Sequence, residues 1–146
     1  MEGVPSLAMV ETVDTEKLAS KLNAAVEALG RGPLCVLVQV NTSGEESKFG
    51  VEPGAGVVSL ATYIATSCPH LRIAGLMTIG MLDYSSRPEN FVCLAACRRD
   101  VAEALGVKEE SLELSMGMSG DFEAAIEMGS TNVRVGSTIF GAREYH

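Results

Sequence analysis

The 146-residue chain has no tryptophan, only two histidines and few cations for its length. Eleven Lys and Arg residues stand against nineteen Asp and Glu residues, which gives a formal net charge of −8. A surface that binds nucleic acid through its phosphates needs clustered Lys and Arg. Arg98-Arg99 is the only adjacent basic pair. The composition therefore argues against nucleic acid as a partner.

Long apolar runs and an export signal are also absent. No window of about 18 consecutive apolar residues could form a membrane-spanning helix, and Met1–Pro5 shows no basic region leading into an apolar one. Two histidines add too few ligands for a zinc site, and the cysteines form no Cys-x-x-Cys pair; they are Cys35, Cys68, Cys93 and Cys97. We expect an intracellular chain with free thiols, no metal and no membrane partner.

The sequence does contain a regular alternation of strand-like and helix-like segments. Strands are predicted over 7–13, 34–40, 73–79, 112–116 and 132–135. Helices are predicted over 14–29, with Asp14 as the N-cap, and over 57–67, 89–105 and 121–128. This alternation predicts a parallel sheet with right-handed crossovers. An open doubly wound sheet and part of a (β/α)8 barrel both satisfy it; because a full barrel takes about 250 residues, the pattern alone favours the open sheet.

Two glycine-rich loops follow the last two predicted strands. Parallel α/β sheets bind ligands at the carboxyl ends of their strands, and barrels hold phosphate after the last two. The loops are Gly117-Met-Ser-Gly120 and Gly136-Ser-Thr-Ile-Phe-Gly141. Their backbone N–H groups and the hydroxyl of Ser119 suit an anion such as phosphate. The alternative is that the glycines only permit tight turns.

Arg134 is a second candidate for the site. Alternation places it on the face opposite Val133 and Val135, which is the barrel interior or the far side of an open sheet. A buried Arg needs an acceptor, either a carboxylate in a structural ion pair or a ligand. Met118, at a strand end, either packs in the core or lines a flat apolar ligand.

Other chemistries lack support. Residues 136–141 have the glycine spacing of a P-loop, but Ala142-Arg143 stands where Lys and Ser or Thr would hold phosphate and magnesium. No histidine lies beside a serine as a general base, so a hydrolytic triad has no basis. Lys48 lies in a candidate loop, but its glutamate neighbours favour a solvated, salt-bridged role.

Four stretches of the chain together resemble the pyridoxal phosphate homeostasis protein family, which is related to the N-terminal domain of alanine racemase. They are MVETVDTEKLASKLN (9–23), VLVQVNTSGEESKFG (36–50), GLMTIG (75–80) and LSMGMSGDFEAAIEMGSTNVRVGSTIFGAREY (114–145). The resemblance implies a fold-type III barrel that holds pyridoxal 5′-phosphate (PLP) without a second, catalytic domain. It therefore favours the barrel over the open sheet. Residues 1–146 would be the C-terminal part of one such (β/α)8 domain, about strands 4–8 with their helices.

The resemblance also implies roles for particular residues. The phosphate would lie against Ser119 and the backbone of Gly136 and Ser137, and Arg134 would face the pyridine nitrogen. Met118, from its place at a strand end, is the candidate to line the cofactor. A permanent cation beside the pyridine nitrogen disfavours protonation of that nitrogen and weakens the ring as an electron sink. This suits non-catalytic binding of PLP in vitamin B6 homeostasis, with PLP-dependent apo-enzymes as recipients. No catalytic residue is expected.

The sequence departs from the family in one respect. The family forms its Schiff base through a lysine in an early Ala-Val-Ser-Lys-like segment, which this sequence lacks, and Lys48 matches a different loop. We therefore expect a truncated gene model, an alternative start or a partial chain. The alternatives to a homeostasis protein are a fold-type III PLP enzyme, such as an amino-acid racemase, and an inactive truncated product. The cytoplasm is the expected location, and an organelle stays open because a targeting segment would lie in the missing N-terminus.

Overall fold

The computed structural model describes residues 3–45, 49–80 and 87–141. Five strands alternate with helices within these residues. The strands are β1 (Met9–Val13), β2 (Leu34–Gln39), β3 (Leu71–Met77), β4 (Glu113–Met118) and β5 (Asn132–Arg134). The helices are α1 (Glu16–Ala28), α2 (Ala55–Ser67), α3 (Pro88–Leu105), α4 (Phe122–Glu127) and α5 (Ser137–Phe140), with a 3₁₀ turn, η1 (Glu109–Ser111), before β4.

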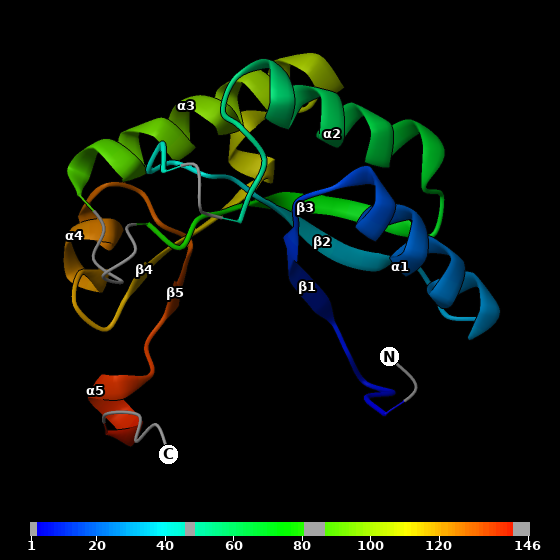
Figure 1. Ribbon diagram of the computed structural model, residues 1–146, viewed down its shortest axis with the longest axis horizontal. Helices are drawn as coiled ribbons and strands as arrows, with labels where there is room; N and C mark the ends of the chain where they lie inside the picture. The colour runs from blue at the N-terminus through cyan, green and yellow to red at the C-terminus, as the bar shows by residue number, and fades with distance from the viewer. Residues whose placement is uncertain (1–2, 46–48, 81–86, 142–146) are drawn as a thin grey trace.

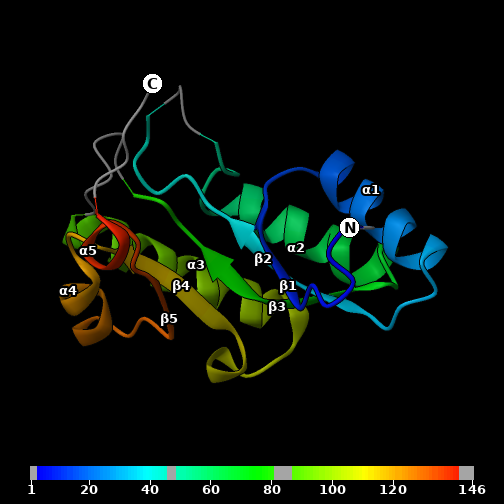
Figure 2. The ribbon, with the colours of Figure 1, turned by 90° about the horizontal axis from the view of Figure 1, so that it is seen from below.

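The strands form one parallel sheet in the order β1-β2-β3-β4-β5. The sheet curls into an arch with α2 and α3 over its convex face (Figure 1), and seen from the open side the strands lie in front of those helices (Figure 2). A doubly wound sheet reverses its strand order, and this one does not. The open sheet favoured by the pattern is therefore wrong, and the partial barrel is confirmed. Periodicity predicts the alternation of elements but not the side on which each new strand is added.

The main hydrophobic core lies between the sheet and the helices. Strand residues such as Val36, Val38 and Leu114 pack there with helix residues such as Ile64 and Leu94, all fully buried. Burying one such side chain contributes about 1.5–3 kcal/mol. This layer holds the strands in place and so positions the loops at their carboxyl ends.

A smaller apolar cluster lies on the concave face of the sheet. Its buried members are Leu37, Ala74 and Met77, with Cys35 packed against them. Apolar side chains therefore cover β2 on both faces. The continuous apolar run over 34–40 is the sequence signature of that double burial.

The N-cap of α1 and the presence of a short helix after β5 differ from the sequence prediction. The N-cap of α1 is Thr15, whose Oγ1 accepts a hydrogen bond from the Leu18 N–H at 3.2 Å, rather than Asp14. Both residue types cap helices well, so composition alone does not choose between neighbours. The segment after β5, expected as a loop, contains the short helix α5, because four residues are too few to show a helical period.

None of the helices in the described ranges is long and apolar enough to cross a membrane. Across those ranges, no group of three or more His, Cys, Asp or Glu side chains is placed to hold a metal ion. All four cysteines are free thiols.

Candidate functional site

The two glycine-rich loops lie next to each other because their strands are paired. Met118, at the end of β4, is in register with Arg134, at the end of β5. Parallel strands present their carboxyl ends at the same edge of a sheet. Ser119 and Gly136, which follow within two residues of these ends, therefore meet at one end of the arch.

Ser119 connects the two loops. Its Oγ accepts a hydrogen bond from the Gly136 N–H at 3.0 Å and one from the Thr138 N–H at 3.4 Å. The Thr138 hydroxyl donates to the Ser119 carbonyl oxygen at 3.5 Å. Two backbone N–H groups thus converge on one oxygen, which is the arrangement that binds an oxygen of an anion. Gly136, Ser137 and Thr138 are exposed, so a ligand can reach these groups.

The turn that presents Ser119 is shaped by its neighbours. The Met118 N–H donates to Asp121 Oδ1 at 2.6 Å, and the Asp121 N–H donates to the Met118 carbonyl oxygen at 3.0 Å. Gly117 has φ +97°, and a Cβ there would lie 2.6 Å from the Ala125 Cβ on α4. Only glycine allows both this backbone conformation and this close approach. Met118 itself is half-buried.

Arg134 lies on the concave face, as alternation along the strand predicted. Its Nη1 donates to the Ser115 hydroxyl at 2.6 Å, and its Nη2 donates to the Thr78 carbonyl oxygen at 2.7 Å. Ser115 is on the concave side, because Leu114 and Met116 on either side of it belong to the core under the helices. The guanidinium is thus held at both terminal nitrogens.

Burial lowers the pKa of Arg134, and the nearby carboxylates of Glu11 and Asp121 oppose that effect. An arginine side chain nevertheless stays charged in a protein. The site therefore contains a permanent, partly desolvated cation on the concave face.

Glu11 supplies a carboxylate from the opposite edge of the sheet. Its Oε2 accepts from the Ser115 hydroxyl at 2.7 Å, and its Oε1 accepts from the Asn132 side-chain amide at 3.1 Å. β2 and β3 separate β1 from β4 in the sheet, so this contact crosses the concave face. Sequence reasoning missed Glu11, Ser115 and Thr78. They could have been found as polar side chains on the concave face of strands that are otherwise apolar.

A pair of hydroxyls, one of them buried, supports the Thr78 end of the site. The Thr78 and Thr42 hydroxyls lie 2.8 Å apart, and the Asn90 side-chain amide donates to the Thr42 carbonyl oxygen at 2.8 Å. Thr78 is 2% exposed and Asn90 4%. The carbonyl that accepts from Arg134 thus belongs to a segment anchored to the loop after β2 and to α3.

The structure does not place every residue considered above. Lys48, Ala142-Arg143 and residues 81–86 between β3 and α3 lie outside the described residues. Ser137 is exposed at the first position of α5. The structure therefore brings Met118, Ser119, Gly136 and Ser137 to one end of the arch, with Arg134 beside them on the concave face.

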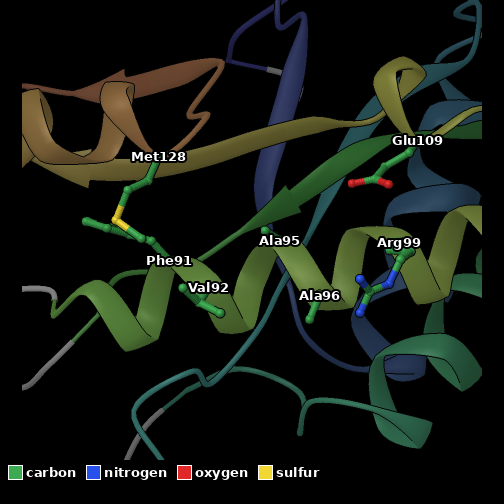
Figure 3. A pocket seen from close by; sticks show the side chains of 7 residues that line it. All are labelled: Phe91, Val92, Ala95, Ala96, Arg99, Glu109 and Met128. Carbon is green, nitrogen blue, oxygen red and sulfur yellow. The ribbon is translucent and has the colours of Figure 1, made fainter.

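A separate pocket lies beside α3. Phe91 and Arg99 from α3 and Met128 at the end of α4 line part of it (Figure 3). None of the predicted site residues lines this pocket. It lies on the helical side of the sheet, opposite to the face that holds Arg134.

These features define a class of protein: a parallel β/α half-barrel with converging backbone donors and a fixed cation at the carboxyl ends of its last two strands. The chain belongs to the family described as "Alanine racemase, N-terminal domain", whose sequence model matches residues 2–144.

Pyridoxal phosphate homeostasis proteins are similar in sequence. The Mus musculus protein is 52% identical over 146 residues, covering 97% of this chain and 53% of its own length. The Vibrio cholerae protein is 45% identical over 139 residues, with coverages of 93% and 56%. The resemblance seen in the sequence is confirmed, and the chain spans about half the length of these curated relatives.

Solved structures show the same architecture. A structure described as an unknown protein from Bifidobacterium adolescentis has a TM-score of 0.77 at 39% identity, over 90% of this chain and 52% of that one. PipY of Synechococcus elongatus with PLP bound has a TM-score of 0.73 at 28% identity, over 96% of this chain and 64% of that one. Corynebacterium glutamicum alanine racemase, at 16% identity with a TM-score of 0.62, shares the fold.

Proposed function

We propose that residues 1–146 are the C-terminal part of a single PLP-binding barrel domain and that the loops after β4 and β5 bind the cofactor's phosphate. The observation that carries this proposal is the convergence of the Gly136 and Thr138 N–H groups on one oxygen, Ser119 Oγ. PipY, which has the same architecture, was solved with PLP bound, and the similar curated proteins are named for PLP homeostasis.

The residues at these loops fit a phosphate. The Gly136 and Thr138 N–H groups, which donate to Ser119 Oγ in this structure, would donate to a phosphate oxygen instead, and the Ser119 hydroxyl would itself donate to the phosphate. The exposed hydroxyl of Ser137 adds another donor at the first position of α5. Met118, half-buried at the end of β4, provides an apolar contact for the ring. Backbone donors of this kind bind an anion without a lysine side chain.

Arg134 faces the pyridine nitrogen in this proposal. Because its guanidinium is permanently charged, it donates to an unprotonated nitrogen and disfavours adding a proton there. PLP supplies an aldehyde that condenses with amines and a ring that withdraws electrons, and an unprotonated ring withdraws them weakly. Arg134 therefore favours retention of the cofactor over reaction of a bound amino acid.

We infer a non-catalytic role in vitamin B6 homeostasis in the cytoplasm, with PLP-dependent apo-enzymes as recipients of the cofactor. Among the described residues, the lysines lie on α1 or just before η1, away from the proposed site. The carboxylate of Glu11 accepts hydrogen bonds from Ser115 and Asn132, so it holds these two side chains in place. Alanine racemases share the fold at low identity, and that likeness does not carry their activity to this chain.

A binding titration with matched serine variants tests the phosphate assignment. Ser119→Ala removes the hydroxyl between the loops, whereas Ser59→Ala changes an exposed residue on α2. A hydrogen bond to a charged group contributes about 1.5–3 kcal/mol, so Ser119→Ala should weaken PLP binding about tenfold or more while Ser59→Ala leaves it unchanged. Equal affinity in both variants would show that the phosphate binds elsewhere.

A further inference from the structure

The carboxylate of Glu11 determines how Ser115 meets Arg134. A serine hydroxyl has one hydrogen to donate and two lone pairs to accept with. The Ser115 hydrogen goes to Glu11 Oε2 at 2.7 Å, so its lone pairs are left for Arg134 Nη1, which donates at 2.6 Å. Glu11 therefore affects Arg134 through the direction of one hydroxyl, without touching the guanidinium.

Glu11 is itself held in place by a second donor. Asn132 Nδ2 donates to Glu11 Oε1 at 3.1 Å, so each carboxylate oxygen has a partner. These partners come from β4 and β5, the strands whose ends carry the phosphate loops. The carboxylate thus has one orientation, and so does the Ser115 hydroxyl.

The other terminal nitrogen of Arg134 meets the backbone. Nη2 donates to the Thr78 carbonyl oxygen at 2.7 Å, and the Thr78 N–H donates to the Ser115 carbonyl oxygen at 3.1 Å. The two acceptors of Arg134 therefore come from residues whose backbones are hydrogen-bonded to each other. Of the two, only the Ser115 hydroxyl can rotate, and Glu11 prevents that rotation.

We propose that Glu11 is a positioning residue: acting through Ser115, it fixes the Arg134 guanidinium and aims it at the pyridine nitrogen of the cofactor. The contact between Arg134 and the ring nitrogen rests on the proposed function, whereas the effect of Glu11 on the position of the Arg134 guanidinium does not. The hydrogen bonds of the Glu11 carboxylate go to Ser115 and Asn132 and not to the Ser119 loop, so its influence falls on recognition of the ring and not on the phosphate. It makes the site selective for a ring nitrogen that can accept a hydrogen bond.

Nuclear magnetic resonance of the arginine guanidinium groups tests directly whether Glu11 holds the Arg134 guanidinium in place. Rotation about the Cζ–Nη bonds of Arg134 should be slow in the wild-type chain, because both terminal nitrogens are hydrogen-bonded. Glu11→Gln should speed this rotation, and Glu103→Gln, an equal charge change at an exposed position on α3, should not. Ser115→Ala should reproduce the Glu11→Gln effect, and the double variant should add nothing. Unchanged rotation in Glu11→Gln would overturn the proposal.

Binding of two ligands tests whether Arg134 contacts the ring nitrogen. The ligands are PLP and its analogue with a C–H group in place of the ring nitrogen. Glu11→Gln should weaken PLP binding about three- to tenfold, the value of one hydrogen bond, and leave the analogue unaffected. Equal weakening of both ligands would refute the role in ring recognition. If the wild-type chain binds neither ligand, the proposed function fails, while the rotation experiment still decides whether Glu11 fixes Arg134.

Discussion

Replacing Gly117 with alanine tests how the turn that presents Ser119 is built. Gly117 has φ +97°, and an added Cβ would lie 2.6 Å from the Ala125 Cβ and 3.1 Å from the Phe122 Cα. A left-handed backbone costs a non-glycine residue about 1–2 kcal/mol, and overpacking costs about 1–3 kcal/mol more. Gly117→Ala should therefore lower the free energy of unfolding by about 2–5 kcal/mol, measured by urea denaturation. It should also weaken PLP binding, because α4 and the loop must move apart.

Gly120→Ala is the matched control for this prediction. It lies in the same loop, its φ is not in the left-handed range, and a Cβ there meets nothing within 4 Å. It should be neutral or slightly stabilising, since alanine restricts the unfolded chain more than glycine does. If Gly117→Ala costs no more stability than Gly120→Ala, the close approach of α4 to β4 is not what shapes this loop.

Three further predictions concern other residues of the site and the core. Arg134→Gln should weaken PLP binding about tenfold or more, the value of a charged hydrogen bond; equal affinity in a titration would remove Arg134 from the site. Thr78→Val should lower the free energy of unfolding by about 1 kcal/mol, because it breaks the hydroxyl pair with Thr42; an unchanged denaturation midpoint would contradict this. Burial raises the pKa of the Cys97 thiol from its usual 9.0 to about 11. As pH rises, the thiol ionises in the unfolded chain before it ionises in the folded one. The stability that the neutral, buried thiol contributes is therefore complete below pH 9.0 and is lost as pH rises toward about 11. Alkylation followed by mass spectrometry should find Cys97 slower to react than in the urea-unfolded chain, and equal rates would refute its burial.

Local chemistry in the sequence was enough to predict the elements and several site residues. The apolar run at 34–40 predicted a strand buried on both faces, and β2 has that burial. Alternation along 132–136 predicted that Arg134 lies on the face opposite Val133 and Val135, and its hydrogen bond to Ser115 places it on that face, the concave one. These inferences held because they depend on a period of two residues along a single strand.

The contacts that the sequence did not predict depend on the curl of the whole sheet. Glu11 and Ser115 are 104 residues apart, and they meet only because β1 and β4 face each other across the concave side. The convergence of the two loops on Ser119 likewise depends on the register of β4 with β5. The preference for an open sheet failed for the same reason, because local periodicity does not show how strands are ordered.

The most direct test of the proposed function is a titration of the wild-type chain with PLP, followed by phosphorus nuclear magnetic resonance and repeated in the presence of inorganic phosphate. The phosphorus signal of PLP should shift in a saturable way, and inorganic phosphate should reverse the shift, because both ligands use the N–H groups of Gly136 and Thr138. A signal that does not shift, or a shift that inorganic phosphate leaves unchanged, would contradict the binding of PLP through its phosphate at the loops after β4 and β5.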